Sequence, residues 1–246
     1  MESKDTTSKV KEQEPSKSIN SSNMLNNLKS DYFMRKLFEY MSKKKSLKTI
    51  KYNKNIQKRM DININNYKDY SEKYTTIDIE IIPMKDKYGK FINIKEEDEE
   101  NYHIYFNDNE ENEIKNTSIT ENNNISKINI IIDYKVESFS NLFEGCECIE
   151  SIYFKKFYRN NITNMSGMFN WCISLKELNI NNFNTNNVTD MSNMFSKCSS
   201  LKDLNLNNFN TNNVTNMWNM FKEFYLLKEL NFNNINTAKF YQTWHS

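Results

Sequence analysis

The chain has 246 residues, a formal net charge of +1 and a hydrophobic content of 37%. This length allows one or two domains, and the near-neutral charge gives no global attraction to nucleic acid. The longest purely apolar run, Ile130–Ile132, is far too short to span a membrane, and residues 1–24 lack the apolar stretch of a secretory signal. We therefore predict a cytoplasmic protein without a membrane span and without nucleic acid as a partner.

The first 60 residues divide into a polar tail and a helical pair. Residues 1–23 are polar and charged, so we expect them to be disordered. Within residues 24–60, an apolar stripe at helical spacing predicts one helix, which Ser30 can cap, and Ser46 can cap a second. The stripe consists of Phe33, Met34, Leu37, Phe38 and Met41.

The helical pair is strongly basic, with ten basic residues and one acidic residue between Arg35 and Arg59. Such a surface could bind phosphate or anionic lipid. We favour the alternative of a solvated face, because no aromatic side chains interleave with the charges.

Residues 61–135 show the alternating apolar pattern of short strands. The predicted strand positions are Ile77, Ile79 and Ile81, then Tyr102, Ile104 and Phe106, and finally the buried run Ile128–Ile132. Nine carboxylates and no basic residue lie between Glu96 and Glu113, which we interpret as a solvated acidic loop. Because the Ile128–Ile132 strand leads directly into the next region, we expect it to cap that region.

Residues 136–237 repeat with a period of 26 residues, and the units begin at positions 136, 162, 188 and 214. The clearest unit, 188–213, has apolar residues at Val188, Met191, Met194, Phe195, Cys198, Leu201, Leu204, Leu206 and Phe209. A fixed period of this length is typical of stacked coils, in which like residues of successive units form a continuous core.

Each unit contains two local periods. Met191, Met194, Phe195 and Cys198 have the spacing of one helical face, which predicts a short helix or turn. Leu201, Leu204 and Leu206 have the spacing of a short strand, which a bend follows. We therefore predict an α/β fold, a short solenoid of about four 26-residue coils. Residues 61–135 would form a β-rich capping region, residues 24–60 a helical pair, and residues 238–246 a C-terminal tail.

The pattern Leu201-x-x-Leu204-x-Leu206 resembles the leucine-rich repeat core. The longer string Val-Thr-Asp-Met-Ser-Asn-Met-Phe-Ser-x-Cys-x-Ser-Leu-Lys-x-Leu-Asn-Leu, starting at Val188, resembles the BspA-type leucine-rich repeat. This resemblance implies a non-enzymatic interaction module, and a surface adhesin is one alternative because bacterial members often lie on cell surfaces. Residues 24–60 faintly resemble the F-box, which implies a second alternative, a substrate adaptor of a ubiquitin ligase.

The expected binding site is the polar concave face beside the strand leucines, and its partner is another protein. Its residues recur every 26 positions: Glu177, Asn179, Asn181, Asp203, Asn205, Asn207, Glu229, Asn231 and Asn233. Such a strip could accept hydrogen bonds from Lys, Arg or backbone N–H groups of a partner. Alternatively, the amides could bond to one another along the stack and serve stability alone. Trp171, Trp218 and Tyr225 depart from the repeat and are candidates for either binding anchors or local packing.

Catalytic or metal-binding patterns are not apparent in the sequence. Cys146, Cys172 and Cys198 lie 26 residues apart, and we interpret them as buried structural thiols, with a metal site or a disulfide as alternatives. The two histidines, His103 and His245, adjoin no nucleophile motif, and no phosphate-binding loop is present. We predict that the protein is not an enzyme and needs no cofactor or metal.

Overall fold

The computed structural model describes residues 29–40, 53–60, 75–122, 124–226 and 229–231. The chain divides into two compact parts, Met1–Asn63 and Ile64–Ser246. The predicted tails, 1–23 and 238–246, lie outside the described residues. The other predicted boundaries stay predictions.

The described residues of the first part, 29–40 and 53–60, include the short helices α2 (Asp31–Tyr40) and α4 (Lys54–Arg59). Ser30 caps α2, as predicted, by accepting a bond from the amide of Phe33 at 3.4 Å. Met34, Phe38 and Ile56 are buried. Phe33, in contrast, is 65% exposed, so it does not belong to the buried stripe.

The predicted start of the second helix, with Ser46 as its cap, is not tested, whereas α4 begins after Asn53. Asn53 caps α4 by accepting a bond from the Ile56 amide at 3.1 Å. Ser46 lies outside the described residues. Arg59 Nε pairs with Asp31 Oδ1 at 2.8 Å and ties α4 to α2.

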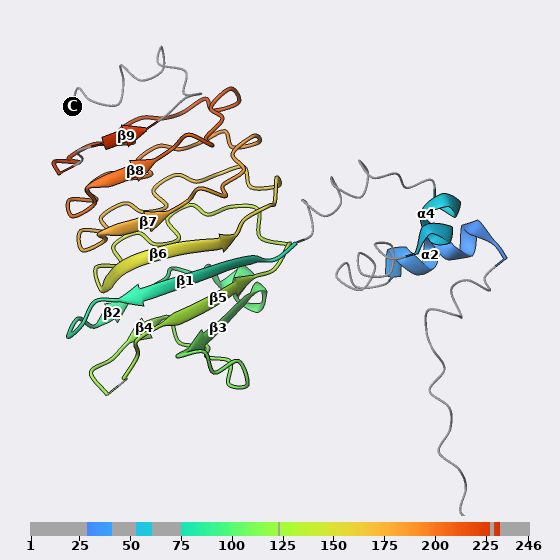
Figure 1. Ribbon diagram of the computed structural model, residues 1–246, viewed down its shortest axis with the longest axis horizontal. Helices are drawn as coiled ribbons and strands as arrows, with labels where there is room; N and C mark the ends of the chain where they lie inside the picture. Colours follow the sequence, from blue (N-terminus) through green and yellow to red (C-terminus); the bar gives the residue numbers. More distant parts are fainter. Residues whose placement is uncertain (1–28, 41–52, 61–74, 123, 227–228, 232–246) are drawn as a thin grey trace, which may run out of the picture. The chain divides into compact units, whose positions relative to one another are not determined.

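The second part begins with a mixed five-stranded sheet in the order β3-β5-β1-β6-β7 (Figure 1). Its strands are β1 (Ile77–Pro83), β3 (Tyr102–Phe106), β5 (Ile128–Ile132), β6 (Ile149–Lys156) and β7 (Glu177–Asn179). The predicted strands at 77–81, 102–106 and 128–132 are confirmed. Neighbouring strands are antiparallel except β6 and β7, which are parallel. Shorter elements are β2 (Gly89–Lys90), β4 (Ser118–Ile119) and the 3₁₀-helix η1 (Glu96–Asn101).

The strand that joins the sheet to the repeats is β1, and the expectation that Ile128–Ile132 caps them is wrong. β1 lies antiparallel between β5 and β6, with Ile79 opposite Phe154 and Ile81 opposite Ile152. Asn93 covers the beginning of the first unit on its turn side, which is the side of the stack formed by the turns of the units and opposite the strands. Its backbone amide donates to the Leu142 carbonyl at 2.7 Å, and its side chain donates to the carbonyls of Asn141 and Glu144. Chain adjacency therefore did not decide which segment closes the stack.

The 26-residue period is visible in the backbone contacts between units. β6 pairs with β7, and β8 (Asp203–Asn205) pairs with β9 (Glu229–Asn231), each in parallel register with an offset of 26. On the opposite side of each unit, parallel bridges join Ser138, Asn164, Asp190 and Asn216 in succession. Figure 1 shows these segments lying side by side along the second part.

The segment predicted as a short helix or turn, 191–198, consists of two consecutive turns. Asn193 and Lys197 adopt the left-handed region, with φ of 53° and 61°, which interrupts a right-handed helix. Amides at alternate positions then point toward the next unit. Met191, Asn193, Phe195 and Lys197 donate to carbonyls at 216, 218, 220 and 222. The spacing i, i+3, i+4, i+7 fits both a helix and this pair of turns, so the apolar pattern alone could not separate them.

The predicted fold class is wrong. An α/β class implies helices as well as strands in the repeating units. In the described residues of the second part, the 3₁₀-helix η1 lies before the units, and the units consist of strands and turns. Its largest sheet is mixed and is shared between the region before the repeats and the first two units. The fold is therefore mostly sheet and turn.

One apolar core runs through the second part, from Ile77 to Phe224. A column of rings forms its turn side: Phe143, Phe169, Phe195 and Phe221 stack with successive centroid distances of 5.7 Å. All nine apolar positions predicted for unit 188–213 are buried. Arg159 is also fully buried and donates to the carbonyls of Asp133 and Val136, which fixes the start of the first unit.

Candidate protein-binding surface

The predicted site residues lie on the outer face of the strands, which we define as the side chains of β6, β7 and β8 that point away from the core. Glu177, Asn179, Asn181, Asp203 and Asn205 are exposed, and Asn207 is half-buried. The backbones of Glu229 and Asn231 lie in parallel register with Asp203 and Asn205, although their side chains lie outside the description. Asn233 also lies outside the described residues.

The asparagine side chains on this face do not bond to one another along the stack. Asn179 Oδ1 accepts from the Asn181 amide at 3.2 Å, and Asn205 Oδ1 accepts from the Asn207 amide at 3.0 Å. Each oxygen therefore serves the turn that ends its own strand. The predicted amide ladder is absent between these described residues.

Other asparagines bond successive units together, at positions that the sequence analysis did not single out. The side-chain amide of Asn208 donates to the carbonyl of Asn181. Asn187 and Asn213 donate in the same way to Asn160 and Asn186, the first at 2.7 Å. Because a side chain of one unit satisfies a backbone carbonyl of the unit before it, these bonds stabilise the stack and leave the outer face free.

The carboxylates of the outer face have different surroundings. Glu177 accepts a hydrogen bond from the hydroxyl of Tyr153 on β6, and this bond raises the pKa of Tyr153 above its ordinary value. Asp203 is exposed and forms no ion pair with a described residue. Lys176 is engaged elsewhere, since its ammonium pairs with Glu150 at 2.8 Å. Asp203 is therefore an acceptor available to a partner.

The outer face continues onto β1, beyond the repeats. Glu80 lies opposite Tyr153 and pairs with Lys155 at 2.5 Å, and Asp78 pairs with Lys156 at 2.5 Å. The alternation in β1 marks Asp78 and Glu80 as outward-facing, but nothing in the sequence indicates that β1 lies beside β6. Sequence reasoning therefore missed Tyr153, Glu80 and Lys155 as neighbours of the predicted site.

The three aromatic residues singled out in the sequence lie in or beside the turns of the units. Trp171 is 46% exposed, Trp218 54% and Tyr225 76%. The ammonium of Lys197 lies 3.6 Å from the Trp171 ring centroid, and it also pairs with Glu223 at 3.5 Å. Trp171 thus has a cation over one ring face, while Trp218 and Tyr225 stay candidates for binding or packing.

The four cysteines are free and buried. Cys172 Sγ donates to the Phe143 carbonyl at 3.0 Å, and Cys198 Sγ donates to the Phe169 carbonyl at 3.1 Å. Burial raises the pKa of both thiols, and it raises that of Cys148 to about 11. The geometry agrees with buried structural thiols, and the described residues contain no cluster suited to a metal ion.

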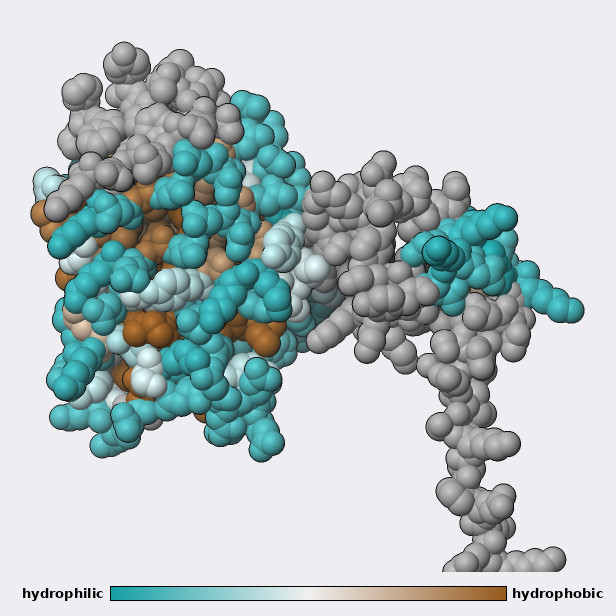
Figure 2. Space-filling view, viewed as in Figure 1, coloured by the Kyte–Doolittle hydropathy of each residue, from teal (hydrophilic) through white to brown (hydrophobic). Residues whose placement is uncertain are grey.

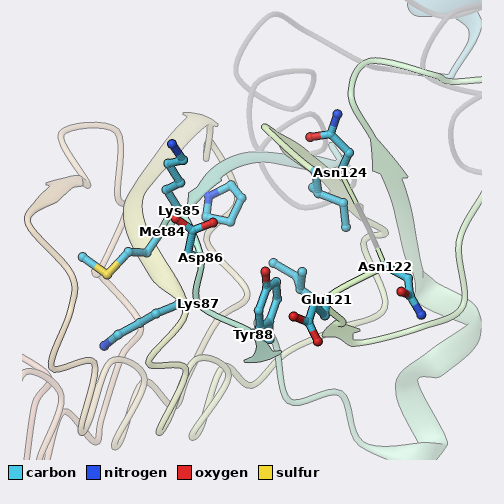
Figure 3. Close-up of a pocket in the computed structure, with 11 residues that line it drawn as sticks. Met84, Lys85, Asp86, Lys87, Tyr88, Glu121, Asn122 and Asn124 are labelled. Carbon is cyan, nitrogen blue, oxygen red and sulfur yellow. The ribbon is translucent and has the colours of Figure 1, made fainter.

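A separate cavity of about 300 Å³ lies between the loop after β1 and the segment after β4. Figure 3 shows Tyr88 and Glu121 close together at its wall, with Lys87 directed away from it. Lys87 instead reaches Ser174 Oγ at 2.8 Å. None of the nine predicted site residues lines this cavity.

Stacked 26-residue units with an exposed polar strand face define a repeat protein. A family model described as "Mycoplasma protein of unknown function, DUF285" matches residues 111–244, more than half of the chain, so the chain belongs to this family. No curated protein and no solved structure matches the chain. The resemblance to the BspA-type repeat stays a prediction. Among the described residues, no helix is long and apolar enough to cross a membrane.

Proposed function

We propose that the chain is a non-enzymatic module that binds another protein through the outer face of its strands. The observation that carries this proposal is the repetition of one polar pattern, every 26 residues, on the three strands β7, β8 and β9. Carboxylate, leucine and asparagine recur at 177–179, 203–205 and 229–231, with Glu177, Asn179, Asp203 and Asn205 exposed. A regular strip of acceptors on rigid strands suits recognition of an extended partner segment.

The charges of this face favour partners that present hydrogen-bond donors. Asp203 has no described cation beside it, and Asn179 and Asn205 keep their side-chain N–H groups free for a partner's carbonyls, since only their oxygens are used within the chain. The F-box-like adaptor and the surface adhesin gain no further support from the described residues. They stay predictions, as does the cytoplasmic location.

Affinity capture with the full chain tests this proposal. Glu177, Asp203 and Glu229 changed together to Lys should abolish retention of the partner proteins identified by mass spectrometry, because the acceptor strip becomes cationic. The matched control changes Glu110, Glu111 and Glu147, three exposed carboxylates away from the strip, to Lys. If both triple variants retain the same proteins as the native chain, the site assignment is wrong.

A further inference from the structure

The first part of the chain carries two large aromatic side chains on its surface. Tyr32 and Phe33 in α2 are 66% and 65% exposed, and their rings pack edge to face with centroids 5.8 Å apart. The sequence analysis placed Phe33 in the buried stripe, but the buried apolar residues described in this part are Met34, Phe38 and Ile56. The aromatic pair therefore lies outside the small core that α2 and α4 share.

Cations lie beside this aromatic pair. Lys36 follows Tyr32 by four positions and Phe33 by three, so the helical period places it next to both rings on one face of α2. Lys36 is exposed, as are Arg35 and, just before the helix, Lys29. The buried positions of α2 lie on the other side of the helix. The exposed face of α2 thus combines two aromatic rings with positive charge.

The acidic residue in the first turn of α2 is neutralised within the same part. Asp31 pairs with Arg59 of α4 at 2.8 Å. Between Arg35 and Arg59 the sequence holds ten basic residues and one acidic residue, so the surroundings of α2 are strongly positive. Figure 2 shows the described residues of this part as hydrophilic on the face drawn. The aromatic rings are therefore an apolar feature of a polar, cationic surface.

We propose that this aromatic–basic face, defined as Lys29, Tyr32, Phe33, Arg35 and Lys36, binds the surface of an anionic lipid bilayer. Aromatic side chains favour the boundary between headgroups and acyl chains, and cations beside them attract anionic headgroups. The sequence analysis favoured a solvated basic face because no aromatic residues interleave with the charges. The structure supplies two, exposed next to the cations of α2.

A single-stranded nucleic acid suits this face less well than a bilayer does. Bases stack on open ring faces, whereas the edge of one ring here covers a face of the other. A compact pair of rings instead forms an apolar wedge that enters the headgroup layer while α2 lies along the bilayer surface. This inference goes beyond the proposed function, which concerns the outer face of the second part.

Sedimentation of the full chain with lipid vesicles tests the inference. The native chain should bind vesicles of equal parts phosphatidylglycerol and phosphatidylcholine about tenfold more tightly than vesicles of phosphatidylcholine alone. The double variant Tyr32→Ser, Phe33→Ser should bind the mixed vesicles about tenfold more weakly, since the inserted ring area is lost. The matched control Tyr88→Ser, Tyr158→Ser removes two exposed aromatic residues of the second part and should bind like the native chain.

A fluorescent reporter tests the orientation and keeps an aromatic ring in place. The emission of Phe33→Trp should be quenched by mixed vesicles with brominated acyl chains, whereas Tyr158→Trp should be quenched no more than the native chain. Equal binding to the two kinds of vesicle, equal affinities of the two double variants, or equal quenching of the two reporters would each overturn the inference. If a single-stranded oligonucleotide binds while the mixed vesicles do not, the face is a nucleic-acid site and the bilayer assignment is wrong.

Discussion

The turn side and the strand side of the repeat stack both recur with the 26-residue period, but only on the turn side does the hydrogen bonding between units continue without interruption. On the turn side, backbone bonds and a column of phenylalanine rings continue through all four units. On the strand side, β6 pairs with β7 and β8 pairs with β9, but no ladder joins β7 (Glu177–Asn179) to β8 (Asp203–Asn205). The difference indicates that the turn side supplies the continuous backbone bonding that maintains the stack.

The largest expected effect comes from breaking the turn side at its ring column. Phe195→Ala removes a fully buried ring that stacks on Phe169 and Phe221, and should lower the free energy of unfolding by about 3–5 kcal/mol. Asp203→Ala on the outer face should change it by less than about 0.5 kcal/mol. Denaturant titration of both variants measures the contrast, and similar losses would show that the two sides contribute alike.

A smaller effect is expected from the turn geometry itself. Gly167 has a φ of +60°, and a Cβ there would collide with the side chain of Asn141 in the preceding unit. Gly167→Ala should therefore destabilise the chain by about 1–2 kcal/mol. Asn193→Gly at the equivalent position, with a φ of 53°, should stay within about 0.5 kcal/mol of the native chain. A neutral Gly167→Ala variant in thermal unfolding would contradict the left-handed turn.

The smallest effect concerns the outer face and should leave the fold unchanged. The bond to Glu177 raises the pKa of Tyr153, because a neighbouring carboxylate favours the neutral phenol. Glu177→Gln should lower that pKa toward its ordinary value, as followed by NMR titration of labelled tyrosine. Because the pKa of Tyr153 is higher in the folded than in the unfolded chain, this bond stabilises the fold at pH values below the unfolded pKa. The contribution disappears as the pH rises through the folded pKa. An unchanged titration would mean that the two side chains do not interact in solution.

The sequence predicted the period and the buried positions because apolar residues recur every 26 positions and the same positions are buried in each unit. Val188, Met191 and Phe195 are buried as expected, and the alternation at Ile77–Ile81 marks a real strand. The apolar spacing at 191–198 fits both a short helix and a pair of turns, so the sequence left the two open and only the structure chose between them. The pairing of β1 with β6 could not be inferred either, since it joins segments distant in sequence.

The interruption between β7 and β8 has no signature in the sequence. Residues 177–179 and 203–205 share the pattern of acid, leucine and asparagine, yet β7 and β8 do not pair while β8 and β9 do. The polar positions could therefore be predicted residue by residue, whereas the interruption is visible only in the structure. Only the three-dimensional arrangement distinguishes Leu178 from Leu204.

Amide hydrogen exchange resolved by residue tests the central claim most directly, since it compares the two sides of the stack in one measurement. The amides of Met165, Phe169, Met191 and Phe195, which donate to the next unit, should exchange about 100-fold more slowly than the backbone amides of β7 and β8 that face the neighbouring, unpaired strand. Full protection of every amide in β7 and β8, or rapid exchange along the turn side, would contradict the account.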